Sequence, residues 1–366
     1  MSRATGGSRA DSTHDDSLPD KIVDQRLGCL LAGSPFYVEV LDVVAADVAV
    51  EGPCLEVLRP HAAAPRGDAV LLRFLAGVHH LVLSGQAPEL AAHYPSVGGT
   101  PGVGLGDTFV ETVRRHVDEL RAAMHLGVQT NEVGRSVALL TGLLALPSAG
   151  SGPLRLRLLE VGASAGLNLW LDRYRYESDD SAIGPIDSPV RFRSPWLGAA
   201  PDLERRFEVV SREGCDRAPI DPTDPAGRRR LRSYVWPDQT ERAERLDAAL
   251  AVAGAEKPVV VQADAVDWAA DRLHRRVQGV VTVLFHTIML QYLTASERRR
   301  FARLVDEAGQ RATAGSPLVW LRMEPGGDQA DVWLTTWPGG TTRLVARSAY
   351  HGPPVALAGR SGVPSA

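Results

Sequence analysis

The residues RLRLLEVGASAGLNLWLDRYRY at 155–176 give the clearest indication of the fold class. This stretch begins with an apolar run that ends in Glu160, passes through the small residues GASAG at 162–166, and continues with apolar residues at helical spacing. A buried strand, a turn of small residues and an amphipathic helix are typical of one unit of a parallel sheet. Because small residues let the backbone approach a ligand closely, we predict that this turn binds a ligand.

Short apolar runs rich in β-branched residues alternate with helical stretches after this turn. The predicted strands are FEVVSREGCD (207–216), PVVVQAD (258–264), GVVTVLF (279–285) and SPLVWLRME (316–324), and the predicted helices lie near 165–175, 226–253 and 295–310. This alternation predicts an α/β fold with a mostly parallel sheet covered by helices on both faces. A closing antiparallel hairpin is expected around Pro338. The segment 177–205, rich in Asp, Ser, Pro and Gly, is expected to be an inserted loop or a lid.

The first part of the chain has a helical period instead. Apolar residues at Phe109, Val113, Val117, Leu120 and Met124 lie three or four apart, and Ser34 with Pro35 marks a helix start. The run PSAGSGP at 147–153 then breaks the pattern. We therefore predict a tail at 1–20, an all-α domain at 21–150, an α/β domain at 151–352 and a second tail at 353–366.

The amino-acid composition excludes several classes of protein. The 366 residues carry a formal net charge of −4 and 44% hydrophobic residues, which indicates a soluble globular protein of about two domains. Generic binding to nucleic acid or to a membrane is not expected, since there is no basic stripe and no apolar run of 18 residues. The three cysteines form no CxxC pair, so we predict no metal site and a cytoplasmic location.

Residues 160–166 read ExGxSxG, and this pattern resembles the first motif of class I S-adenosylmethionine-dependent methyltransferases, usually (D/E)xGxGxG. The resemblance implies a Rossmann-like methyltransferase fold that binds S-adenosylmethionine, with Ser164 in place of the central glycine. A nicotinamide-dependent oxidoreductase remains a second alternative. It is disfavoured because a GxGxxG fingerprint would need glycine at the positions of Ser164 and Leu167.

The ends of the next two predicted strands extend the resemblance. Asp216, in REGCDRAPID, resembles the acid that accepts hydrogen bonds from both ribose hydroxyls, and Asp264 with Ala265 resembles the adenine site. Each aspartate can instead be an ordinary helix cap or turn residue. The cofactor site that the resemblance implies consists of Glu160, Gly162, Ala163, Ser164, Gly166, Asp216, Asp264 and Ala265.

Two further groups of polar residues are candidates for contact with the substrate. His286, at the end of the strand 279–285, is a candidate general base, with a hydrogen-bonded structural histidine as the alternative. The segment GVQTNEVGRS at 127–136 gathers polar side chains that either hold the substrate or form a plain helix start. Its candidate substrate-binding residues are Gln129, Asn131, Glu132 and Arg135.

The combination of QTNEVGRS, LLEVGASAGLNL, GCDRAPID and VWPDQTERAERLDAAL resembles the uncharacterised bacterial family called domain of unknown function 2332, over about residues 22–352. This resemblance supports the fold but implies no activity. The expected function therefore rests on the methyltransferase motif: methyl transfer from S-adenosylmethionine to a small molecule. An inactive methyltransferase-like protein that senses a ligand or binds a partner is the first alternative.

Overall fold

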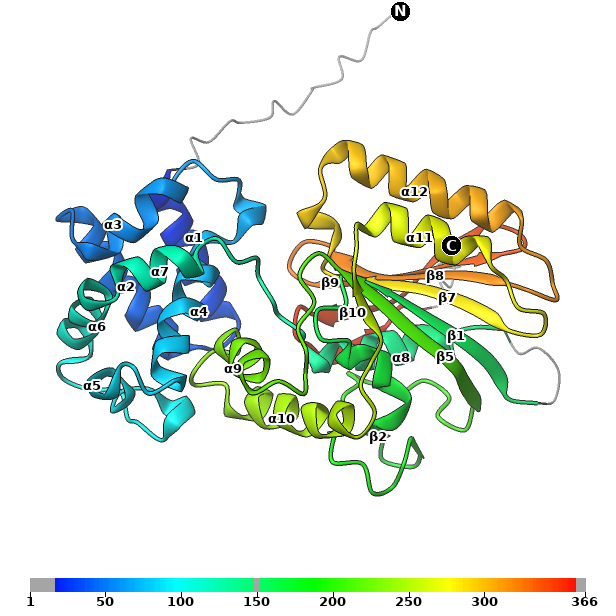
Figure 1. Cartoon of the computed structure of the whole chain (residues 1–366). Helices are drawn as coiled ribbons and strands as arrows, with labels where there is room; N and C mark the ends of the chain where they lie inside the picture. The colour runs from blue at the N-terminus through cyan, green and yellow to red at the C-terminus, as the bar shows by residue number, and fades with distance from the viewer. Residues whose placement is uncertain (1–16, 148–151, 360–366) are drawn as a thin grey trace, which may run out of the picture. The chain divides into compact units, whose positions relative to one another are not determined.

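The computed structural model describes residues 17–147 and 152–359, which form two compact units (Figure 1). The helical unit comprises the described residues up to Val128 together with Trp236–Asp238, and the α/β unit holds the rest. The boundary therefore lies at Val128 and not near residue 150 as predicted. The reason is that helix α8 (Ser136–Leu144) packs on the sheet.

The helical unit confirms the N-terminal helical region. Its helices are α1 (Leu18–Leu31), α2 (Pro35–Ala49), α3 (Pro53–Leu58), α4 (Val70–Leu83), α5 (Pro88–Ala91), α6 (Leu105–Arg115) and α7 (Val117–Ala123), with 3-10 turns η1 (Arg59–His61), η2 (Arg66–Asp68) and η3 (Pro95–Val97). Ser34 caps α2 as predicted, because its hydroxyl accepts a hydrogen bond from the Tyr37 N–H. The apolar stripe from Phe109 to Met124 is divided between α6 and α7 at His116, whose backbone leaves the helical conformation.

The segment Trp236–Asp238, between helices α9 (Pro225–Ser233) and α10 (Thr240–Ala255), completes the helical unit. The Asp238 carboxylate accepts hydrogen bonds from the Ser34 hydroxyl at 2.7 Å and from the Phe36 N–H at 3.0 Å. The Trp236 ring packs against Tyr37 in the same core. Pro237 lies between these anchors, so the predicted helix over 226–253 is broken into two.

The α/β unit is built around an eight-stranded sheet in the order β11-β10-β9-β8-β7-β1-β5-β6. The strands are β1 (Leu154–Val161), β5 (Phe207–Asp216), β6 (Val260–Gln262), β7 (Val281–Thr287), β8 (Leu318–Pro325), β9 (Ala330–Trp337), β10 (Thr341–Ala349) and β11 (Gly352–Leu357). The five strands from β6 to β8 are parallel, and β8 to β11 form an antiparallel meander. The predicted α/β fold with a mostly parallel sheet is therefore confirmed.

Helices cover both faces of this sheet (Figure 1). The α/β helices and 3-10 turns are η4 (Val133–Arg135), α8, η5 (Leu167–Arg173), α9 (Pro225–Ser233), α10 (Thr240–Ala255), α11 (Ala265–His274), η6 (Leu290–Tyr292) and α12 (Ala295–Gln310). The pleat sends alternate side chains to opposite faces. Thus Leu158 of β1 lies in the core with α8, η5 and α10, and Leu159 lies in the core with α11 and α12.

Several local predictions need correction. The amphipathic helix predicted near 165–175 is the short turn η5, buried from Leu167 to Leu171, followed by strand β2 (Arg175–Glu177). The segment 177–205, expected to be an inserted loop or a lid, adds β3 (Ala182–Ile183) and β4 (Arg191–Arg193) to β2 in a small sheet, and its Phe192 and Trp196 belong to the core.

The ends of the chain differ from their predicted extents. In the predicted C-terminal tail, the residues up to Leu357 form the edge strand β11. In the predicted N-terminal tail, Leu18 already belongs to α1, and residues 1–16 lie outside the described part. The expected hairpin around Pro338 is confirmed by β9 and β10. No helix within 17–147 or 152–359 has the length and apolar character needed to cross a membrane.

Candidate functional site

The carboxyl ends of three neighbouring parallel strands carry the acids predicted for a cofactor site. Strand pairing sets Glu160 of β1 beside Gly214 of β5. It also sets Asp216 of β5 beside Gln262 of β6, and Asp264 follows two residues later. The three acids therefore follow one edge of the sheet, next to the point between β1 and β7 where the strand order reverses. Open α/β sheets bind ligands at such points.

Glu160 lies on the face covered by α8 and η5, because it follows Leu158 of that core by two residues. The residue is 2% exposed, and its Oε2 atom has no hydrogen-bond partner among the described residues. Burial, and then the charge of Asp216, raise the pKa of this carboxyl well above its ordinary value, although Arg135 opposes the shift. A buried oxygen without a partner is costly, so a ligand that donates a hydrogen bond here gains that energy.

The turn after β1 takes left-handed backbone conformations at Gly162 (φ +71°), Ser164 (φ +52°) and Gly166 (φ +73°). A Cβ atom at Gly162 would lie 2.7 Å from the side chain of Met289, so only glycine fits there without a shift. At Ser164, a left-handed conformation costs a residue other than glycine about 1 kcal/mol. The serine therefore holds the conformation that glycine adopts most readily.

The Asp216 carboxylate fastens this turn to the end of β5. Its Oδ2 accepts a hydrogen bond from the Ser164 N–H at 2.9 Å. Its Oδ1 accepts from the Ala218 N–H at 2.9 Å and from the Gln129 side-chain amide at 3.5 Å. The structure thus brings together two predicted cofactor residues and one predicted substrate residue.

Gln129 also contacts the turn directly. Its Oε1 accepts a hydrogen bond from the Ser164 hydroxyl at 2.5 Å, and its Nε2 donates to the Ala218 carbonyl at 3.1 Å. The residue is 4% exposed. Its amide is therefore held entirely by the ends of β1 and β5.

Asn131 satisfies backbone donors on the far side of the turn. Its Oδ1 accepts hydrogen bonds from the N–H groups of Ala165 at 3.2 Å and Leu167 at 3.0 Å. Leu167 is the first residue of η5, where an N–H group has no partner within the helical turn, and Ala165 lies within the predicted glycine motif. One backbone donor of the motif and the first donor after it are therefore occupied by a side chain of the same protein.

Glu132 forms a buried ion pair next to this contact. Its Oε2 accepts from Nε and Nη2 of Arg242 at 2.7 and 2.6 Å, and its Oε1 accepts from the Gly134 N–H at 3.0 Å. Burial by itself raises the pKa of Glu132, but Arg242 and His351 lower it to about 2. Burial, followed by the charge of Arg242, lowers the pKa of His351 to about 3. At neutral pH this is a carboxylate paired with one guanidinium beside a neutral imidazole.

Arg135 is buried but forms no ion pair with an acid among the described residues. Its Nε donates to the Tyr350 carbonyl at 3.0 Å, and its Nη1 donates to the Thr287 carbonyl at 3.4 Å. Its guanidinium thus links the segment before α8 to the ends of β7 and β10. Its charge lowers the pKa values of both Glu132 and Glu160.

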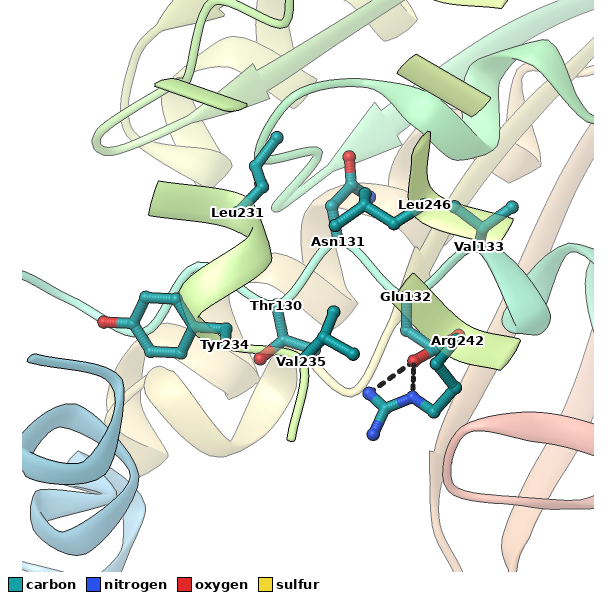
Figure 2. A pocket seen from close by; sticks show the side chains of 9 residues that line it. All are labelled: Thr130, Asn131, Glu132, Val133, Leu231, Tyr234, Val235, Arg242 and Leu246. Carbon is teal, nitrogen blue, oxygen red and sulfur yellow. Dashed lines mark hydrogen bonds and ion pairs between the residues drawn. The ribbon is translucent and has the colours of Figure 1, made fainter. Parts of the chain in front are cut away.

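A pocket opens beside Glu132 (Figure 2) and encloses about 270 Å³, part of it open to solvent. The close view shows the Glu132–Arg242 pair on one side and Asn131 pointing away from it. The lining consists of Thr130, Asn131, Glu132, Val133, Leu231, Tyr234, Val235, Arg242 and Leu246. The enclosed part of this space is about 10 Å³, room for about one water molecule, so the hollow is too small for a small-molecule ligand in this conformation.

The sequence matches the model of a bacterial family, described as "uncharacterized protein conserved in bacteria" (DUF2332), over residues 21–356. The chain belongs to this family. No curated protein and no solved structure matched it. The family assignment confirms one of the two resemblances seen in the sequence and supplies no activity.

In this DUF2332 protein, Asp264 caps helix α11. Its Oδ1 accepts hydrogen bonds from the N–H groups of Val266 at 2.8 Å and Asp267 at 3.3 Å. Oδ2 takes no hydrogen bond from any residue in the described ranges. Ala265 is the first residue of α11. Capping thus uses one carboxylate oxygen and leaves the other available to a ligand.

His286 forms the hydrogen bonds that the structural alternative for this residue leads one to expect. It is 0% exposed, and its Nε2 accepts a hydrogen bond from the Trp320 indole N–H at 3.0 Å. Its Nδ1 lies 2.6 Å from Glu324 Oε1, so the Nδ1 atom carries the proton. Both ring nitrogens are bonded within the protein, and neither is available to take a proton from a substrate in this conformation.

Sequence reasoning missed Arg242, His351 and Met289 as neighbours of these residues. Arg242 is one of many charged residues in the amphipathic sequence of α10, which is typical of a solvated helix face. His351 and Met289 lie in short connections without any pattern of their own. Nothing in the local sequence distinguishes these residues from ordinary surface or core positions.

Proposed function

We propose that this protein binds S-adenosylmethionine at the carboxyl ends of β1, β5 and β6 and transfers its methyl group to a small molecule. The observation that carries the proposal is Glu160, a buried carboxyl with an unpartnered oxygen at the point where the strand order reverses. The ammonium group of the cofactor is a donor that suits this oxygen. Binding it replaces the cost of an unsatisfied acceptor by a charge-assisted hydrogen bond.

Two further features support the same cofactor. The order of the five parallel strands, third-second-first-fourth-fifth, is shared by nucleotide-binding α/β sheets. The left-handed turn 162–166 keeps the strand end free of large side chains, since its residues are glycine, alanine and serine. Both features agree with a Rossmann-like methyltransferase, as the resemblance at 160–166 implies.

In the proposed site each acid has a separate task. Glu160 and the turn Gly162, Ala163, Ser164 and Gly166 hold the methionine end. Asp216 accepts from the ribose hydroxyls, since a carboxylate offers two acceptor oxygens to a vicinal diol. Asp264, through Oδ2, accepts from the adenine amine, and Ala265 offers its backbone N–H.

The remaining task of the protein is alignment. S-adenosylmethionine supplies an activated methyl group on a sulfonium, so the side chains have to orient the acceptor and exclude water, without any covalent nucleophile. The part of the site that binds the methyl-accepting substrate is proposed to consist of Gln129, Asn131, Glu132 and Arg135. Gln129 and Asn131 contact the turn, Glu132 lines the pocket, and Arg135 contacts the carbonyl groups of Thr287 and Tyr350.

The cofactor proposal is tested by titration calorimetry with S-adenosylmethionine and S-adenosylhomocysteine. We expect the wild type to bind both ligands and Glu160→Gln to bind S-adenosylmethionine at least tenfold more weakly, since an amide cannot offer a charged acceptor to the ammonium. Glu208→Gln is the matched control, because Glu208 is an exposed residue of β5, away from the turn. No heat from either ligand at millimolar concentration refutes the cofactor claim.

One observation favours the alternative of a ligand-sensing protein without catalysis. The hydrogen-bonding groups of the turn are already satisfied by Gln129, Asn131 and Asp216. A sensing protein binds S-adenosylmethionine and S-adenosylhomocysteine but releases no methyl group. Incubation with methyl-labelled cofactor and extracts of small metabolites, followed by mass spectrometry, distinguishes the two functions.

A further inference from the structure

Residues 129–132, named here the strap, lie across the turn that follows β1. Gln129 contacts Ser164 and Asp216, and Asn131 contacts the N–H groups of Ala165 and Leu167. The strap immediately follows Val128, the last residue of that part of the helical unit. It is therefore the segment by which the chain passes from one unit into the other.

The strap forms hydrogen bonds with the same polar groups that the proposed cofactor would contact. The Gln129 amide donates to the Asp216 carboxylate and accepts from the Ser164 hydroxyl, so it stands in for the ribose hydroxyls assigned to Asp216. The Asn131 oxygen fills the backbone donors next to the turn as an anionic or polar ligand group would. With Gln129 4% and Asn131 8% exposed, these contacts are closed to solvent.

We propose that the side chains of Gln129 and Asn131 occupy the ligand site in the ligand-free protein, and that the strap must move away from the turn before S-adenosylmethionine binds. This inference rests on the proposed function, because it concerns the same site. It assigns the two residues a gating role in the ligand-free protein, beyond contact with a substrate.

The contacts of the strap divide it into a fixed end and a movable part. Glu132 is fixed by its ion pair with Arg242, and its carbonyl accepts a hydrogen bond from the Asn168 side chain at 3.3 Å. Gln129 and Asn131 are held by hydrogen bonds and by no ion pair, and only the 3.5 Å contact of Gln129 with the Asp216 carboxylate involves a charged group. Neutral hydrogen bonds contribute less than a buried ion pair loses when it is broken. The strap is therefore expected to open at Gln129 and Asn131 and to pivot at Glu132.

The test compares S-adenosylhomocysteine binding by the wild type, Gln129→Ala, Asn131→Ala and Asn131→Asp in calorimetry. Asn131→Ala removes the oxygen that holds two N–H groups, so the dissociation constant should fall about tenfold. Asn131→Asp keeps an acceptor oxygen and should show no such gain. Gln129→Ala gives an independent measurement if Asn131→Ala does not fold.

Hydrogen exchange of wild-type peptides covering 126–136 gives a second readout. Faster exchange of this segment on addition of S-adenosylhomocysteine supports the gate, and unchanged or slower exchange overturns it. Equal affinities of all variants, or weaker binding by the alanine variants, also overturn the gate while leaving the cofactor proposal intact. If no folded variant binds the ligand at all, the cofactor proposal fails and the gate fails with it.

Discussion

Replacing Glu160 by glutamine should stabilise the ligand-free protein, and the gain should grow with pH. The carboxyl is 2% exposed, its Oε2 has no partner among the described residues, and burial together with Asp216 raises its pKa well above 4.5. The folded state therefore keeps this proton at pH values where the unfolded chain has released it. A glutamine has nearly the same shape as the protonated acid and never has to ionise.

The magnitude follows from proton linkage. The folded-state pKa is raised, so above about pH 4.5 the folded protein binds one proton more than the unfolded chain. The unfolding free energy contributed by this group then falls by up to about 1.4 kcal/mol per pH unit, until the folded-state pKa is reached. Below pH 4.5 both states hold the proton and the difference between variant and wild type is constant.

Urea unfolding of the wild type and Glu160→Gln at pH values from 5 to 7 measures this slope. Contributions from all other titrating groups cancel in the difference, provided that they are the same in both proteins. Glu208→Gln, at an exposed position of the same sheet, is the matched control. A pH-independent difference for Glu160→Gln would show that Glu160 is ionised and paired in the folded protein, and the reasoning would be wrong.

Four other outcomes are expected. Asp264→Ala removes the cap of α11 and should lower the unfolding free energy by about 1 kcal/mol. Asp264→Asn keeps a capping oxygen and should lose little stability. Both variants should bind S-adenosylhomocysteine more weakly if Oδ2 contacts the adenine. Glu132→Gln leaves Arg242 buried without its charge partner and should cost about 3–5 kcal/mol in urea unfolding, and adding Arg242→Met should recover part of that loss. His286→Leu leaves buried groups without partners and should lower stability by about 2 kcal/mol or more, yet calorimetry should find ligand affinity unchanged. The affinity for S-adenosylmethionine should rise with pH, because Glu160 has to lose its proton to pair with the ammonium; an affinity that is flat between pH 5.5 and 7.5 would contradict that pairing.

Local patterns were sufficient to predict most of the strands and their class. The runs at 279–285 and 316–324 are mostly apolar over the length of a strand, the run at 207–216 begins with the apolar residues of FEVV, and each forms a parallel strand of the sheet. The helix start at Ser34 was also visible, since a capping hydroxyl followed by proline acts within one turn of helix. These features depend on residues close together in the chain.

Other features depended on partners far away in the chain. The helix predicted near 165–175 is a buried 3-10 turn, because Asn131 and the core determine its hydrogen bonds and burial. Asp264 and His286 were each compatible with a site and with a structural role. Only the positions of α11 and Trp320 show the structural contacts that they make.

Local patterns in the amino-acid sequence are sufficient to show that strands and helices alternate after a helical first part, and that Glu160 lies near the end of a strand, before a turn of small residues. Period and turn chemistry are local properties, so they can be read without coordinates. The folded chain is needed to show that Glu160 is buried with an oxygen that has no partner among the described residues, and that Gln129 and Asn131 contact the same turn. Those facts depend on hydrogen bonds between segments that are far apart in sequence, and no local pattern contains them.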